Sequence, residues 1–364
     1  MNRPILAILL IALATAVNAQ VPDAISGATL KPEYLLKYLD DPETRAIYNS
    51  DPYDNQPETM LEGAIFTVQG EILNPGVPSI DGLHLREVVV KELLPSENNG
   101  EPVFMGAFRY TGYSLPDLLR DFVIDKVNRE EFGLNHDLYL LVENERGESA
   151  TFSWGELFNS QRGKDIILAI SVSPVFPTNS DERWEVPRNC RIIAGNDYLT
   201  VRNIENPTRI TIASFPVSFE GTKGTTPLYS PVLTIYLDGK PTTISDVNKY
   251  GVENHTLKTV FFGLHKGFRR LSRFTGASFG DLLTDIYNPG AKEIKNGIIA
   301  IGAKDGYRAV YSLSEIVNRA DIDEVLIIDD EQDDDGRFMI FPASDFFADR
   351  FMKGSVKAYI RIVD

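Results

Sequence analysis

Runs of branched aliphatic residues recur along the chain, separated by polar segments rich in Gly, Pro, Asn and Asp. Apolar runs bounded in this way are typical of β-strands. They predict strands at residues 64–72, 138–142, 166–173, 191–194, 208–213, 232–237, 297–303, 322–328, 337–341 and 356–363. Turn residues at 74–76 (Asn-Pro-Gly) and 238–239 (Asp-Gly) predict that two series of strands each open with a strand pair.

Four serines mark the starts of short helices: Ser114, Ser153, Ser278 and Ser312. Each is followed three residues later by Asp or Glu and then by apolar side chains, which is the pattern of a capping box. We predict that these serines are helix N-caps rather than nucleophiles, because no Gly-x-Ser-x-Gly elbow and no His partner lies near them. Strands with short helices inserted between them predict an α+β or mixed α/β sheet fold.

The chain repeats itself. Residues 109–119 (RYTGYSLPDLL) match residues 273–283 (RFTGASFGDLL), and 150–158 (ATFSWGELF) match 309–317 (AVYSLSEIV) in the same order. Near each end an Asp stands five residues before an Arg, as Asp197 and Arg202 and as Asp345 and Arg350. We predict a signal peptide at 1–19, an N-terminal arm at 20–60, a first domain at 61–215, a linker at 216–231 and a second domain at 232–364.

The N-terminus has the pattern of an export signal. Arg3 precedes an apolar run at 5–17, and small or apolar residues stand at Val17 and Ala19 before the predicted cleavage point. The run is short for a membrane span, so we expect an exported protein, periplasmic or extracellular, without a span after cleavage. A retained anchor is the alternative.

The charge of the chain restricts its partners. Lys and Arg number 36 and Asp and Glu 52, which gives a net charge of −16. This balance repels nucleic acid and disfavours anionic lipid surfaces. The lone Cys190 excludes an intramolecular disulfide and is predicted to lie in the core.

In their order, the segments RFTGASFGDLL, KDGYRAVYSLSEI and GRFMIFPASDFFADRFMKGSVKAYIRIV resemble the sulfite-oxidase-type molybdopterin-binding fold, and residues 62–213 offer a second copy. The resemblance implies two tandem sulfite-oxidase-like domains and a bound molybdopterin. In that family a cysteine thiolate upstream of the TGxxLxDLL helix holds molybdenum. Residues 88–110 and 257–274 contain no cysteine, which argues against molybdenum catalysis. His265 lies near the corresponding position and is a weak metal candidate.

The remaining candidate sites are clusters of charged residues. If a ligand site exists, we expect it between the TGxxLxDLL helix and the loop before the closing strand. Its candidate anion contacts are Arg109, Arg191, Arg273 and Arg337. The basic cluster at 265–273 either receives a phosphate or carboxylate or balances nearby acids. The acidic stretch at 329–335 does not fit an EF-hand and is predicted to be a solvated hairpin tip, with one loosely bound cation as the alternative.

These observations favour an exported, non-catalytic module that binds a small anionic ligand or an envelope protein. One alternative is a periplasmic molybdopterin-dependent oxidoreductase. Another is an envelope glycan- or peptide-binding protein in which Tyr110, Tyr113, Trp154 and Trp184 line a groove.

Overall fold

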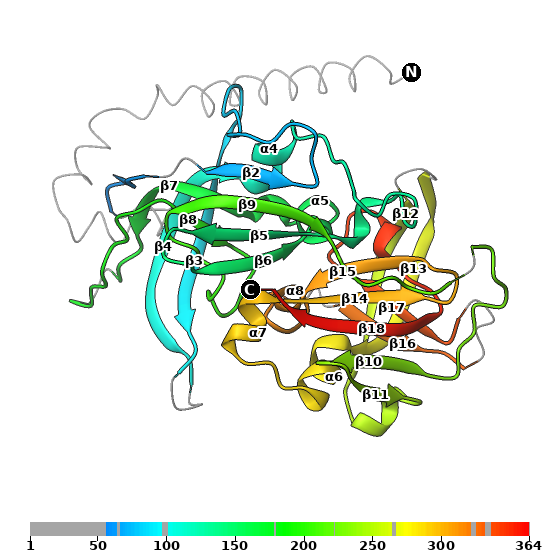
Figure 1. The fold of residues 1–364 in the computed structure, drawn as a ribbon. Coiled ribbons are helices and arrows are strands. Elements are labelled where there is room, and N and C mark those ends of the chain that lie inside the picture. Colours follow the sequence, from blue (N-terminus) through cyan, green and yellow to red (C-terminus); the bar gives the residue numbers. More distant parts are fainter. Residues whose placement is uncertain are drawn as a thin grey trace, which may run out of the picture. The chain divides into compact units, whose positions relative to one another are not determined.

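The structure is a computed structural model that describes residues 56–63, 66–96, 101–177, 180–221, 223–263, 267–321, 325–331 and 336–363. The predicted signal peptide and most of the predicted arm lie outside these residues. Residues 56–175 and 182–364 form one compact unit, which contains both copies of the repeat (Figure 1). In the part of the chain that the structure describes, no helix is both long and apolar enough to cross a membrane.

The predicted fold class is wrong. The chain is mostly β, with 46% strand and 15% helix, and its four small sheets are arranged as a four-bladed β-propeller rather than as an α+β or mixed α/β fold of sulfite-oxidase type. Two long strand pairs outside the predicted strands account for part of the difference. They are β3 (Leu85–Leu94) with β4 (Val103–Ser114), and β12 (Asn254–Gly263) with β13 (Gly267–Ser278). The predicted helices are present, but they are only five to eight residues long.

Two sheets are built from the first half of the compact unit. One has the order β1-β7-β4-β3, with β8 paired to β7, and the other has the order β2-β9-β5-β6. The remaining bounds are β1 Thr59–Met60, β2 Thr67–Gly70, β5 Leu138–Asn144, β6 Ser149–Ser153, β7 Ile166–Pro174, β8 Arg191–Ala194 and β9 Pro207–Ser214.

The second half uses the same pairing order. Its sheets are β11-β10-β18-β14-β15 and β12-β13-β16-β17, and the parallel pair β10–β18 stands where β2–β9 stands in the first half. The bounds are β10 Leu233–Leu237, β11 Lys240–Ile244, β14 Gly297–Ala303, β15 Arg308–Ser312, β16 Val325–Asp329, β17 Phe338–Pro342 and β18 Ser355–Ile362. Most predicted strands are therefore confirmed to within a few residues.

Short helices follow the predicted capping serines. Ser114 caps α4 (Leu115–Leu119), Ser153 caps α5 (Trp154–Phe158), Ser278 caps α6 (Phe279–Ile286) and Ser312 caps α8 (Leu313–Val317), so the N-cap prediction is confirmed. A full capping box forms only at Ser153 and Ser312, where Glu156 and Glu315 are long enough to reach back to the N-cap backbone. The other helical segments are α7 Ala291–Asn296, η1 Asn135–Asp137, η2 Gly163–Asp165, η3 Val247–Tyr250 and η4 Ala348–Arg350.

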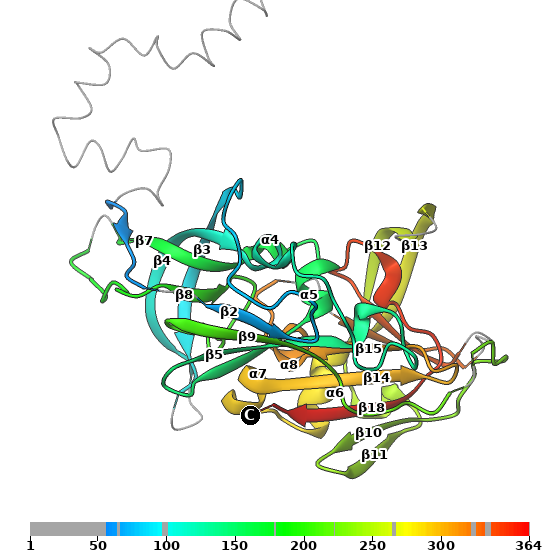
Figure 2. The same cartoon turned by 45° about the horizontal axis from the view of Figure 1, so that its top comes forward.

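Each half has its own apolar core. A further cluster joins the halves, in which strand β5 packs against β14 and β15. The largest cluster of the first half includes Phe152 and Leu140, and that of the second includes Tyr311 and Ile299. Strand β6 contacts β14 and β15 of the other half, and the two central sheets run side by side in both views (Figure 2). The helices α5 and α8 are thereby brought to the boundary between the halves.

Candidate functional site

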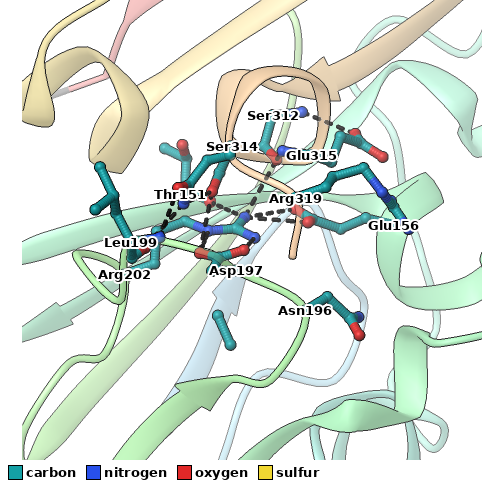
Figure 3. A network of polar contacts seen from close by, with 12 residues as sticks. Thr151, Glu156, Asn196, Asp197, Leu199, Arg202, Ser312, Ser314, Glu315 and Arg319 are labelled. Atoms are coloured by element: carbon teal, nitrogen blue, oxygen red, sulfur yellow. Dashed lines mark hydrogen bonds and ion pairs between the residues drawn. The ribbon is translucent and has the colours of Figure 1, made fainter. Parts of the chain in front are cut away.

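Two fully buried arginines lie where the halves meet. Arg202 donates to both oxygens of Asp197 at 2.6 and 2.7 Å and to Glu156 at 3.0 Å, and all three side chains come from the first half. Its Nη1 also donates to the Oγ of Ser312, the N-cap of α8, at 3.1 Å. Asp197 in turn accepts from the Oγ of Ser314 at 3.0 Å, so the cluster takes in both halves (Figure 3).

Arg350 repeats this arrangement from the second half. It donates to Asp345 at 2.7 and 2.8 Å and to Glu315 at 3.1 and 3.2 Å. Its Nη1 reaches the Oγ of Ser153, the N-cap of α5 in the first half, at 3.3 Å. The guanidinium lies over the ring of Tyr311, as that of Arg202 lies over Phe152. Each arginine thus donates a hydrogen bond to the capping serine of the other half.

The network around Arg202 and Arg350 contains more acidic than basic side chains. Arg202 and Arg350 face four carboxyl groups, those of Asp197, Glu156, Asp345 and Glu315. Burial raises the pKa of Glu156 to about 7, and the neighbouring Glu315 adds to the rise while Arg202 opposes it. Burial also raises the pKa of Asp345. Because its members are buried and bonded to one another, we assign the network a structural role in joining the halves.

A second buried cluster joins the halves elsewhere. Arg308 on β15 donates to Asp137 at 3.0 Å and pairs with Glu131, and Lys126 also donates to Asp137. The guanidinium of Arg308 lies 4.9 Å from the ring centre of Phe132. All four of these residues, Lys126, Glu131, Phe132 and Asp137, belong to the segment between β4 and β5, so this segment packs against the second half.

Beside these clusters lies a cavity of about 1020 Å³. Its walls come from both halves: η1 and α5 from the first, and the β12–β13 pair and η4 from the second. The lining residues are Gly133, Leu134, Asn135, His136, Trp154, Phe158, Asn159, Phe261, Gly263, Arg269, Arg270, Tyr307, Phe347, Ala348, Asp349, Phe351 and Lys353. A cavity of this size is at the upper end of the range that holds small organic ligands.

Aromatic rings and cations dominate the lining. Trp154 and Phe158 stack with ring centres 4.1 Å apart, and four further aromatic rings line the same space. Arg269, Arg270 and Lys353 bring three positive charges, against the single carboxylate of Asp349. In a chain of net charge −16 this is a local positive region, which favours an anion with an aromatic or apolar part.

His136 supplies a neutral polar group to the cavity wall. Its Nδ1 is buried and has no hydrogen-bond partner, whereas the ring as a whole is only half-buried. Burial lowers the pKa of His136 to about 4, and the nearby Arg350 adds to the shift, so the imidazole is neutral at pH 7. An unpaired acceptor costs less than an unpaired buried N–H, so we assign the proton to Nε2. His136 is therefore a candidate hydrogen-bond donor to a ligand.

The four arginines proposed from the sequence do not line this cavity. Three of them pair with a carboxylate of their own half: Arg109 with Glu87 at 3.5 Å, Arg191 with Glu92 at 3.5 Å, and Arg337 with Asp329 at 2.6 Å. Arg273 is exposed on β13. The structure thus does not bring the four together. The cavity does take part of its wall from the loop before β18, but takes none from α4 or α6.

The aromatic residues proposed to line a groove are also separated. Trp154 lies in the cavity wall, but Tyr110 is fully buried and donates to Glu92 at 2.9 Å. Trp184 donates to the carbonyl of Ala107. The cavity lining was not predicted as a set, although Arg269 and Arg270 belong to the basic cluster noted in the sequence.

The residues present do not fit a thiolate-bound metal centre at the cavity. Cys190 is buried in the β-sheet core of the first half, its Sγ donates to the carbonyl of Gly63 at 3.2 Å, and it is not part of the cavity wall. Burial raises the pKa of its thiol. Among the described residues, no group of three or more His, Cys, Asp or Glu side chains is placed to hold a metal ion. His265 lies outside the described residues.

No family model matches the chain, and no curated protein matches it. Among solved structures, it is similar to the crystal structure of the sulfane dehydrogenase SoxCD from Paracoccus pantotrophus, with 10% sequence identity and a TM-score of 0.28. That similarity covers 83% of this chain and 78% of the other. A likeness this weak carries no argument about activity.

Proposed function

We propose that the protein is an exported binding protein for a small organic anion, which it holds without chemical conversion in the cavity between its two halves. The observation that carries this proposal is the lining of the cavity, where six aromatic rings and three cations face one space. Aromatic walls favour a flat apolar body, and the cations favour a carboxylate, sulfonate or phosphate.

Two features support binding rather than catalysis. Glu156, whose pKa burial raises to about 7, is bonded to Arg202 in the interior and does not line the cavity. The wall itself offers one neutral imidazole and a tyrosine, Tyr307, whose pKa burial raises and whose hydroxyl donates to the carbonyl of Asp349. These groups can orient a ligand, but neither is part of a nucleophile–base pair in the described contacts.

A fluorescence titration tests the proposal. The chain has two tryptophans, so Trp184→Phe leaves Trp154 in the cavity wall as the single reporter. The probe is 1-anilinonaphthalene-8-sulfonate, an aromatic anion, and the comparison is uncharged N-phenyl-1-naphthylamine. We expect saturable quenching of Trp154 by the sulfonate, with binding roughly tenfold or more tighter than that of the uncharged ring.

Variants locate the site. Arg270→Gln with Lys353→Gln removes two cations of the wall and should weaken sulfonate binding about tenfold or more. Arg120→Gln with Lys91→Gln removes the same charge from exposed positions away from the cavity and serves as the control. Equal affinity for both probes, or equal effects of the two double variants, would contradict an anion site in the cavity.

A further inference from the structure

The strand pair β12–β13 projects from its sheet as a two-stranded ribbon. Strand β13 pairs with β16 only at Ala277 and Ser278, whereas β12 accompanies it as far as Gly267. About ten residues at roughly 3.3 Å each give a ribbon of about 30 Å. Both views show it standing out from the rest of its sheet (Figures 1 and 2).

The ribbon has one packed face and one exposed face. Directly opposed residues of an antiparallel pair share a face. On the packed face Phe274 stacks on Phe341, with ring centres 4.0 Å apart. On the exposed face, Lys258 stands opposite Arg273 and Val260 opposite Leu271. Val260 and Leu271 are 50% and 77% exposed, which is unusual for two adjacent aliphatic side chains.

The described charges of the ribbon all have one sign. Lys258, Arg269, Arg270 and Arg273 are its charged residues, and no Asp or Glu occurs in β12 or β13. No ion pair forms at any of the four among the described residues, whereas most other arginines of the chain pair with a carboxylate. Like charges directly opposite, as Lys258 and Arg273 are, destabilise a strand pair. An external anion would relieve this repulsion.

The corresponding pair in the first half lacks this property. In β3–β4 the charges are mixed, and the cations have anionic partners: Arg86 contacts Asp165 at 3.3 Å and Arg109 contacts Glu87 at 3.5 Å. The same fold element thus occurs in the chain without the unpaired cations. The cationic face is a feature of the second half and does not follow from the ribbon geometry.

We propose that the exposed face of the β12–β13 ribbon, defined by Lys258, Val260, Leu271 and Arg273, docks on an anionic phospholipid surface. The cations attract the headgroups, and the aliphatic pair Val260 and Leu271, which lies next to them along the ribbon, enters the interface. The net charge of the chain opposes such binding at long range, but salt limits each charge to a reach of about 8 Å. A projecting ribbon therefore presents its own charge to the surface.

Vesicle sedimentation tests this proposal on the full mature chain. The probes are vesicles of phosphatidylcholine alone and vesicles with 30% phosphatidylglycerol, at low and at physiological salt. We expect binding only to the anionic vesicles, with at least a tenfold loss for Lys258→Gln with Arg273→Gln and a several-fold loss for Leu271→Ser. The control is Lys91→Gln with Arg120→Gln, which removes the same charge elsewhere.

Each other outcome overturns the proposal. Equal losses in the two double variants would show a nonspecific charge effect. Binding to soluble heparin but not to anionic vesicles would identify a polyanion as the partner instead. Unchanged binding of Leu271→Ser would show that the aliphatic pair does not enter the interface. The absence of vesicle binding at low salt would show that the ribbon does not dock on a phospholipid surface. Circular dichroism melting of each variant excludes misfolding, which is not expected at these exposed positions.

Discussion

Arg202 donates from Nη1 to the Oγ of Ser312 at 3.1 Å, across the boundary between the two halves. Arg350 returns the contact by donating to Ser153 at 3.3 Å. Each serine also caps a helix in its own half, so one hydroxyl serves both the local helix and the other half's arginine. The interface is therefore built from the same residues that start the helices.

Replacing Arg350 with Ala should strongly destabilise the protein. The change leaves the buried carboxyl groups of Asp345 and Glu315 without their cation, which typically costs about 3–5 kcal/mol. Urea unfolding measures the loss. Arg129→Ala, which removes an exposed ion pair with Asp125, should cost about 1 kcal/mol or less. A loss at Arg350 no larger than this control would mean that the network does not hold the halves together.

Glu156 makes the stability depend on pH. Because burial raises its pKa from 4.5 to about 7, the folded state binds a proton more tightly than the unfolded state. Protonation of Glu156 therefore stabilises the folded state below about pH 4.5, and this stabilisation is lost as the pH rises through 7. Glu156→Gln keeps an acceptor for the capping box but does not titrate.

Relative to wild type, the Gln variant should gain stability between pH 5 and pH 8, by on the order of 1–3 kcal/mol. The measurement is the difference in unfolding free energy between the two proteins at each pH, since His136 and other groups titrate in both. A difference that stays constant over this range would show that Glu156 is ionised throughout.

His136 makes the stability change with pH in the opposite direction to Glu156. Its pKa is lowered from 6.5 to about 4, so the unfolded state takes up the proton first and stability falls as the pH falls from 6.5 to 4. We expect the carbon-bound ring proton of His136 to titrate near pH 4 in an NMR series, assigned through His136→Gln. Binding of the anilinonaphthalene sulfonate should be flat from pH 5.5 to 8. A titration near 6.5 would mean that the ring is open to water.

Cys190 should be unreactive in the folded protein. Its thiol is 3% exposed and its pKa is raised, so both access and thiolate content are low. Dithionitrobenzoate should react with no thiol in buffer and with one thiol in denaturant, because the chain has a single cysteine. Rapid reaction without denaturant would place the thiol at an accessible site and reopen the question of a thiolate ligand.

Local features of the fold were predictable from the sequence. The serine caps and the buried strands such as β14 and β8 follow from side-chain chemistry and apolar runs within a few residues. The fold class was not predictable in this way. Strands β3 and β12 alternate exposed and half-buried or buried residues with charges among them, so they lack a continuous apolar run. Because these strand pairs were not predicted, the short helices led to the prediction of a mixed fold with too much helix.

The candidate site was less accessible to sequence reasoning. Its wall combines His136 and Trp154 with residues more than a hundred positions later, such as Arg270 and Lys353, and only the packing of the halves brings them together. Recurrence between the copies pointed instead to Arg109 and Arg273, which recur because the strands recur. The spacing of Asp197 and Arg202, by contrast, did recur for a physical reason, since each pair is a buried two-point ion pair.

The exchanged serine contacts have an evolutionary consequence. After a duplication, two copies that fold separately can diverge independently, and each tolerates its own substitutions. Here a change at Ser153 alters the surroundings of Arg350, and a change at Ser312 alters those of Arg202. Neither half can therefore drift alone at these positions, and substitutions there should appear in pairs that span the two copies.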